Sequence, residues 1–177
     1  MKRAMSWALL AAGTALTISA APAMPAAAAA SGGETLNGTI VFSAVPGTNA
    51  RTVLSSVVLA KGAFRGVGRF AEIVPTDPAG VAQDDLVFSR GTMHVVSRLG
   101  NLLSSSINPR SCLFTGTQEF TLEVSGGSGQ FAHATGSFTG TVSGRALLVR
   151  NPDGSCSLTQ VPRLEVDKFT ESGTLSF

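Results

Sequence analysis

Apolar and polar side chains alternate along much of this chain with a period of two residues, and that period decides the fold class. No window of about eleven residues carries the 3.6-residue apolar period that an amphipathic helix requires. The clearest alternating stretch is residues 114–124, where one face holds Phe114, Gln118, Phe120, Leu122 and Val124. The opposite face is built from Thr and Glu. We therefore expect one buried and one wet face, as in an antiparallel strand.

A second alternating stretch covers residues 137–149. Its apolar face is formed by Phe138, Val142, Ala146 and Leu148, and Gly140 and Gly144 fall on the same face. Glycine inside a long strand often marks a bend that curls a sheet toward closure.

Similar patterns predict further strands, and turn signals rich in Pro, Gly and Asn separate them. The predicted ranges are Thr35–Ala44, Arg51–Ala60, Ala63–Ile73, Asp85–Arg90, Thr92–Arg98, Arg163–Thr170 and Gly173–Phe177. Residues 31–34 are expected to be a frayed tail, Leu99–Ser106 a loop, and Pro75 to Gly80 a turn. Eight or so strands without a helical crossover predict a single all-β domain, either a barrel or a sandwich.

The first thirty residues resemble an export signal. Lys2 and Arg3 precede an apolar run, and the Ala tract at Ala26–Ala30 offers small residues for cleavage. The alternative, a membrane anchor, is disfavoured because the segment is rich in Ala and interrupted by Pro. We therefore predict a signal peptide at residues 1–30, a β-barrel domain at residues 31–177, and a secreted protein from a bacterium.

Charge excludes two kinds of partner. The thirteen Lys and Arg residues include Lys2 and Arg3, so the remaining chain carries eleven basic and eleven acidic side chains. A neutral domain lacks the overall basic footprint of a nucleic-acid-binding or membrane-surface protein. We therefore expect no nucleic-acid partner, and no membrane association after signal cleavage.

The only two cysteines are Cys112 and Cys156. In an oxidising compartment they would most economically form one disulfide. The closed loop would contribute about 4 kcal/mol on a chain-entropy estimate. Two free buried thiols are the alternative. No C-x-x-C or Cys/His cluster is present, so neither a metal site nor another cofactor is predicted.

The segment Gly126–Gly136, with the sequence GGSGQFAHATG, carries a family resemblance. It resembles the G-G-T-G-x-F-x-x-A-x-G turn of the allene oxide cyclase and dirigent superfamily, and especially secreted bacterial members of unassigned function. The matching positions are Gly126, Gly127, Gly129, Phe131, Ala134 and Gly136. Ser128 replaces the usual Thr, and Gln130 stands where Arg is frequent. The cysteine pair also resembles those bacterial members, and the similarity extends over about residues 85–177.

This resemblance implies a single antiparallel eight-stranded barrel with a cavity opening at one end. It also implies a homo-oligomer, since the plant enzymes are commonly trimers. The resemblance does not extend as clearly to the activities of the dirigent proteins and the cyclases. Dirigent proteins use cavity Asp, Tyr and Arg residues, and this chain has no Tyr. The buried carboxylate of the cyclases has no counterpart that can be matched residue by residue.

The residues alone offer few catalytic candidates. His94 is expected to face solvent if Met93 and Val95 face inward, and His133 lies on the Gly-rich segment. Asp84 and Asp85 are sequence neighbours, so on a strand their side chains point to opposite faces. No hydrolytic triad can be assembled from these groups.

Gln118 is the one polar residue predicted on an inward face, whereas Glu119 and Glu123 fall on the wet face of the same strand. A buried amide must be hydrogen-bonded within the core or reach a cavity water or ligand. Gln118 is therefore a candidate ligand-binding residue, with a satisfied core amide as the alternative.

Two functions follow as hypotheses. The first is a secreted barrel that binds a small apolar ligand or a partner without catalysis. The second is an isomerase or cyclase resembling allene oxide cyclase, or a dirigent-like stereocontrol protein. Catalysis of this kind needs a buried charged or strongly polar group, and no titratable group is predicted inside. The sequence therefore favours binding.

If the leader is an export signal, the exported protein should be a shortened chain. Cleavage near Ala30 removes Lys2, Arg3 and the only tryptophan, Trp7. Intact-mass analysis of protein recovered outside the expressing cell is expected to give a species starting near Ser31. A secreted species that retains Met1 would contradict the prediction.

Overall fold

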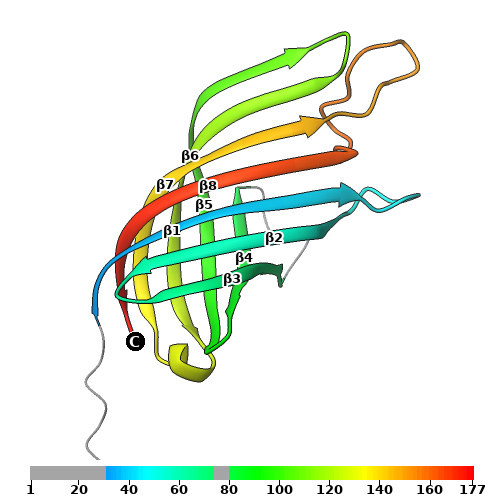
Figure 1. Cartoon of the computed structure of the whole chain (residues 1–177). Helices are drawn as coiled ribbons and strands as arrows, with labels where there is room; N and C mark the ends of the chain where they lie inside the picture. The colour runs from blue at the N-terminus through cyan, green and yellow to red at the C-terminus, as the bar shows by residue number, and fades with distance from the viewer. Residues whose placement is uncertain (1–30, 74–79) are drawn as a thin grey trace, which may run out of the picture.

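The computed structural model describes residues 31–73 and 80–177. The predicted signal peptide and most of the predicted turn from Pro75 to Gly80 lie outside these ranges. The described residues form a closed barrel of eight strands in the order β1 to β8, as the resemblance predicted (Figure 1). Their bounds are β1 Ser31–Ala44, β2 Arg51–Gly62, β3 Arg65–Glu72, β4 Val81–Phe88, β5 Gly91–Asn108, β6 Leu113–Gly127, β7 Thr135–Leu147 and β8 Leu164–Ser176.

Every neighbouring pair of strands is antiparallel, and each strand pairs with the next one along the chain. The barrel closes between β1 and β8, whose register runs from Ser31 opposite Ser176 to Ser43 opposite Leu164. Closure removes the sheet edges that an open sheet would expose along these two strands. The only helix among the described residues is the short 3-10 turn η1, Gly129–Phe131, and none is long and apolar enough to cross a membrane.

The alternation read from the sequence sets which side chains fill the barrel. Phe120, Leu122 and Val124 of β6 are buried, and so is Phe138 of β7. They pack with Leu36, Val58, Leu86, Met93, Val95 and Leu175 from the other strands. The inward faces predicted for residues 114–124 and 137–149 are therefore confirmed.

The Gly-rich segment closes one end of the barrel, at the bottom of Figure 1. The fully buried Phe131 lies 5.0 Å from Phe64, 5.9 Å from Phe88 and 5.4 Å from Phe177, measured between ring centroids. Such aromatic clusters stabilise a core beyond their buried area. This end of the barrel is consequently filled by side chains.

Glycine is required in this segment because the chain reverses tightly against β5. Gly126, Gly127 and Gly129 all have positive φ, which glycine adopts without steric cost. A Cβ at Gly127 would also meet the Thr92 carbonyl oxygen at 1.8 Å. A residue with a side chain would therefore push the loop away from the strand.

Three local predictions are wrong. Residues 31–34 are not a frayed tail, because they pair with β8 in the closing ladder. Leu99–Ser106 is not a loop, because β5 continues to Asn108 and pairs with β6, for example Ser105 opposite Gly116. The two predicted C-terminal strands form the single strand β8, which runs through Glu171 and Ser172 without a break.

The far halves of β5 and β6 project beyond the barrel (Figure 1). The turn between them begins at Asn108, whose side-chain oxygen accepts hydrogen bonds from the Arg110 and Ser111 amides. Cys112, at the end of this turn, forms the predicted disulfide with Cys156. The bond ties the segment after β7 to the β5–β6 turn.

Candidate functional site

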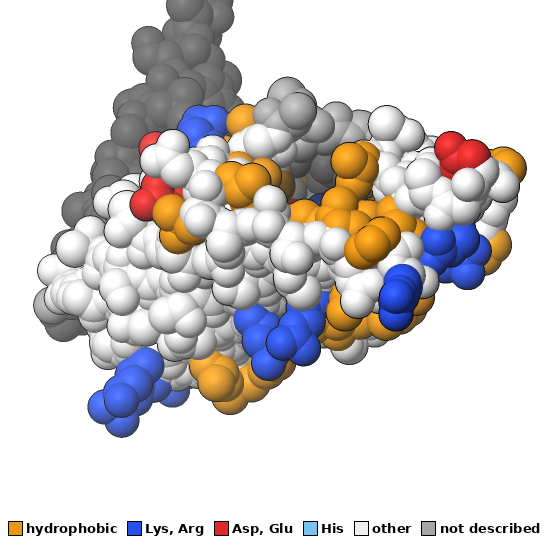
Figure 2. Space-filling model, turned by 90° about the horizontal axis from the view of Figure 1, so that it is seen from above, with side chains coloured by type: hydrophobic (Ala, Val, Ile, Leu, Met, Phe, Trp, Pro, Cys, Tyr) orange, Lys and Arg blue, Asp and Glu red, His pale blue; other side chains and the backbone are white. Residues whose placement is uncertain are grey.

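A cavity of about 550 Å³ opens at the end of the barrel opposite the Gly-rich loop. The view from above shows hydrophobic side chains gathered beside a hollow (Figure 2). The apolar part of the wall includes Val81 from β4, Leu99 and Leu102 from β5, Phe114 from β6 and Val142 from β7. Phe114 and Val142 are there because the period-two alternation continues beyond the filled part of the barrel. The volume is in the range of small-molecule sites.

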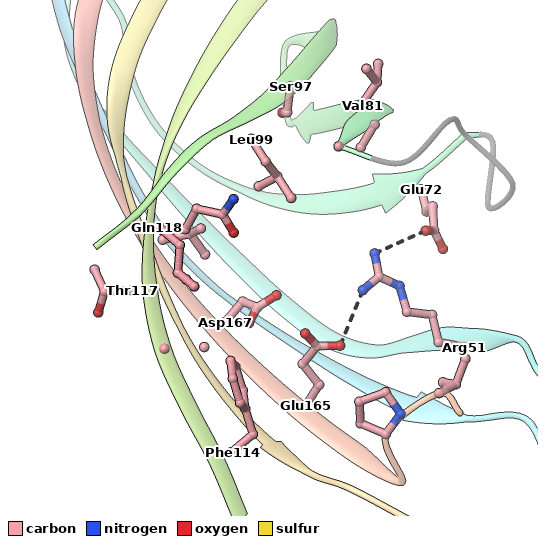
Figure 3. A pocket seen from close by; sticks show the side chains of 18 of the residues that line it. Arg51, Glu72, Val81, Ser97, Leu99, Phe114, Thr117, Gln118, Glu165 and Asp167 are labelled. Atoms are coloured by element: carbon pink, nitrogen blue, oxygen red, sulfur yellow. Dashed lines mark hydrogen bonds and ion pairs between the residues drawn. The ribbon is translucent and has the colours of Figure 1, made fainter. Parts of the chain in front are cut away.

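Arg51, the first residue of β2, is the only cation in the cavity wall among the described residues. Its guanidinium lies 3.3 Å from Glu165 and 3.6 Å from Glu72 (Figure 3). It also lies over the ring of Phe42, 4.1 Å from the centroid. These contacts with three strands fix Arg51 across the mouth of the cavity.

Asp167 of β8 lines the cavity two residues beyond Glu165, on the same face of the strand. It lies beside Gly144 of β7, where an added Cβ would be 2.8 Å from the Asp167 Oδ1 atom. The missing side chain at Gly144 thus provides the room for the carboxyl group. The pKa of Asp167 is raised to about 7, chiefly by burial and secondly by the charge of Glu165, while Arg51 acts in the opposite direction.

Gln118 of β6 lies in the cavity wall, on the inward face predicted for it. Its Nε2 atom donates a 3.0 Å hydrogen bond to the Gly100 carbonyl oxygen of β5. The amide nitrogen is therefore satisfied within the protein, and the residue also borders the cavity. Its role as a ligand contact stays a prediction.

Further carboxyl groups are buried in the barrel, those of Glu171, Glu34 and Asp84. Glu171 of β8 is 1% exposed, and neither of its carboxyl oxygens has a hydrogen-bond partner among the described residues. Burial raises its pKa to about 8. Glu34 of β1, near the filled end, is also buried, and its Oε2 atom accepts a 2.7 Å hydrogen bond from the Phe64 amide.

The expectation that no titratable group lies inside the barrel is therefore wrong. Glu165, Asp167 and Glu171 follow the same alternation on β8 as the buried Leu175. That pattern was available in the sequence, but the predicted break between Thr170 and Gly173 concealed it. The barrel contains acid–base groups, so catalysis is not disfavoured by their absence.

The remaining candidates lie away from the cavity wall. His94 is exposed, as predicted, and its Nδ1 atom contacts the Asp85 carboxylate. Asp84, the neighbour of Asp85, is buried, so the two carboxylates do point to opposite faces. His133 is exposed on the Gly-rich segment.

The other residues singled out in the sequence lie on the outer face of the barrel or at its filled end. Glu119 and Glu123 are exposed on the outer face of β6, as expected. The family-motif residues Gly126, Gly127, Gly129, Phe131, Ala134 and Gly136 belong to the filled end of the barrel, and Ala134 is fully buried. Within residues 31–73 and 80–177, no group of three or more His, Cys, Asp or Glu side chains could hold a metal ion.

Comparison with protein-family models, curated proteins and solved structures finds no match for this chain. The resemblance to the allene oxide cyclase and dirigent superfamily therefore stays a prediction carried by its motif.

Burial of Glu171 predicts a pH-dependent stability. The folded protein retains a proton that the unfolded chain releases above its ordinary pKa of 4.5. Unfolding therefore becomes more favourable as pH rises from about 4.5 to about 8, and Asp167 adds to the same trend up to about pH 7. We expect Glu171→Gln to remove on the order of 5 kcal/mol of that decline.

Urea unfolding followed by circular dichroism across this pH range measures the effect. Glu119→Gln, which makes the same chemical change on the outer wall, is the control and should leave the slope unchanged. Equal slopes in the wild type and Glu171→Gln would show that Glu171 is ionised in the folded barrel.

Proposed function

We propose that this protein binds a small, largely apolar molecule in the open end of its barrel. The observation that carries the proposal is the contrast between the two ends. Aromatic rings around Phe131 fill one end, while the other has a cavity of about 550 Å³ with both apolar and polar walls. A concave, mainly apolar site with a few polar groups is the usual form of a small-molecule site.

The wall of the cavity is built on strands. Val142 and Phe114 belong to β7 and β6, which pair with each other over thirteen positions. A site built on paired strands is held in place before the ligand arrives, which lowers the entropic cost of binding. This supports binding to a preformed cavity.

We also propose that the protein acts outside the cell. The leader Met1–Ala30 and the Cys112–Cys156 disulfide support this, because disulfides persist mainly in oxidising compartments.

Asp167 gives a reason to retain a second candidate, an isomerase or cyclase resembling allene oxide cyclase. A carboxyl group with a pKa of about 7, at the wall of a cavity, has the proton affinity that a general acid or base needs near neutral pH. Binding remains the first proposal because it requires only the cavity, whereas catalysis also requires a reactive substrate positioned against Asp167.

Occlusion of the cavity tests the binding proposal. Nile red, a neutral fluorescent apolar dye, serves as the probe for the mature barrel. Val142→Trp and Leu99→Trp each place an indole ring in the cavity wall, and we expect either change to weaken dye binding by roughly tenfold or more. Val57→Trp on the outer wall is the matched control and should have no effect, since Val57 is already exposed.

Two cavity variants are used because Val142 packs against the core while Leu99 is half-exposed and tolerates a larger side chain more easily. Circular dichroism verifies that each variant is folded. Unchanged dye binding in both folded variants would place the dye outside the cavity and refute the proposal.

A further inference from the structure

Most of the charged side chains that line the cavity are acidic. Glu72, Glu165 and Asp167 contribute three carboxyl groups, and Arg51 is the only positive side chain among the described lining residues. Both ion pairs of Arg51 are made with two of these carboxylates, Glu72 and Glu165. Asp167 is left without a cation of its own.

Asp167 is also the carboxyl group that a ligand can reach with its head group. It points into the space between Gln118 and Glu165 in the close view (Figure 3). It has no hydrogen bond to any residue that the structure describes, whereas Glu165 accepts one from Arg51. Gln118 uses one N–H of its amide on the Gly100 carbonyl, so its Oε1 oxygen, which accepts hydrogen bonds, and its second N–H can still contact a ligand.

Apolar side chains line the cavity beside these carboxyl groups. Leu99, Leu102, Phe114 and Val142 line the same cavity. A ligand that contacts both the apolar side chains and the carboxyl groups needs an apolar body and a head group that donates hydrogen bonds and carries positive charge. An anionic head group would meet carboxylates and would be repelled.

We propose that the cavity selects an organic ammonium ion with an apolar tail, and that Asp167 determines this specificity by contacting the ammonium group. The inference rests on the proposed binding function and names the class of ligand. A partly buried carboxylate without a cation is a suitable partner, because charge-assisted hydrogen bonds strengthen where water is excluded.

The charged groups around Asp167 make binding depend on pH. Glu165 on β8 and Glu72 on β3 contribute negative charge, and Arg51 on β2 contributes positive charge. The strands on either side of β8 contribute no charge at the neighbouring positions, which are Ile40 on β1 and Gly144 on β7. An ammonium ion favours ionised Asp167, so its affinity should rise with pH through the pKa of about 7.

Three octyl compounds test the proposal by calorimetry on the mature protein. Octylammonium, 1-octanol and octanoate share one tail and differ in the charge of the head group. At about pH 8 we expect octylammonium to bind roughly tenfold more tightly than 1-octanol, and octanoate to bind most weakly. Asp167→Asn should remove the advantage of the amine over 1-octanol. Glu119→Gln, the outer-wall control, should leave all three affinities unchanged.

The pH series in the wild type provides a second measurement that does not depend on a variant folding. The advantage of octylammonium over 1-octanol should shrink by roughly tenfold between about pH 8 and about pH 6. Equal affinities for the amine and the alcohol at pH 8, or an amine preference that survives in Asp167→Asn, would overturn the ammonium proposal alone. If none of the compounds binds, 1-octanol included, the proposed binding function fails as well.

Discussion

Closure of the sheet between β1 and β8 is the constraint on which the rest of this structure depends. Once the sheet is closed, every second residue of each strand points inward, and an eight-stranded barrel is only just wide enough for its side chains to fill. At one end the inward positions are completed by Phe64, Phe88, Phe131 and Phe177. At the other end Phe114, Val142 and Asp167 border open space. The functional proposals follow from this difference between the two ends.

Strand β8 shows how the interior accommodates large and polar residues. Three of its inward residues, Asp167, Phe169 and Glu171, each lie against a glycine of a neighbouring strand. A Cβ at Gly38 of β1 would lie 2.2 Å from the Phe169 ring, and one at Gly140 of β7 would lie 2.7 Å from the Glu171 Cβ atom. Gly144 gives the same room to Asp167. The glycines of β1 and β7 therefore make room in the interior for the larger side chains of β8.

Most of the architecture could be predicted from the sequence because alternation is a local signal. The inward faces of β6 and β7 follow directly from the spacing of residues such as Phe120 and Phe138. The extension of β5 past Leu99 could not be predicted in this way. Its residues are exposed and rich in Ser, and they form a strand because β6 pairs with them, a long-range effect that composition does not reveal.

The acidic character of the site was missed for a different reason. Glu165, Asp167 and Glu171 are charged residues, and charged residues are rarely buried, so a break in β8 was a natural expectation. The structure buries Glu171 completely and keeps Asp167 at the cavity wall. Gln118 was found because it interrupts an otherwise apolar face. The ion pairs of Arg51 with Glu72 and Glu165 depend on strand ends that meet only in the closed barrel.

The most direct test of this account is to locate a bound ligand by nuclear magnetic resonance. In the methyl-labelled protein with saturating 1-octanol, we expect intermolecular Overhauser effects from the alcohol chain to the methyl groups of Leu99, Leu102 and Val142, which line the cavity. The buried methyl groups of Val58 and Leu175, in the filled part of the barrel, should show none. Contacts confined to Leu54, Leu59 and Val67, which are exposed on β2 and β3, would contradict a cavity site.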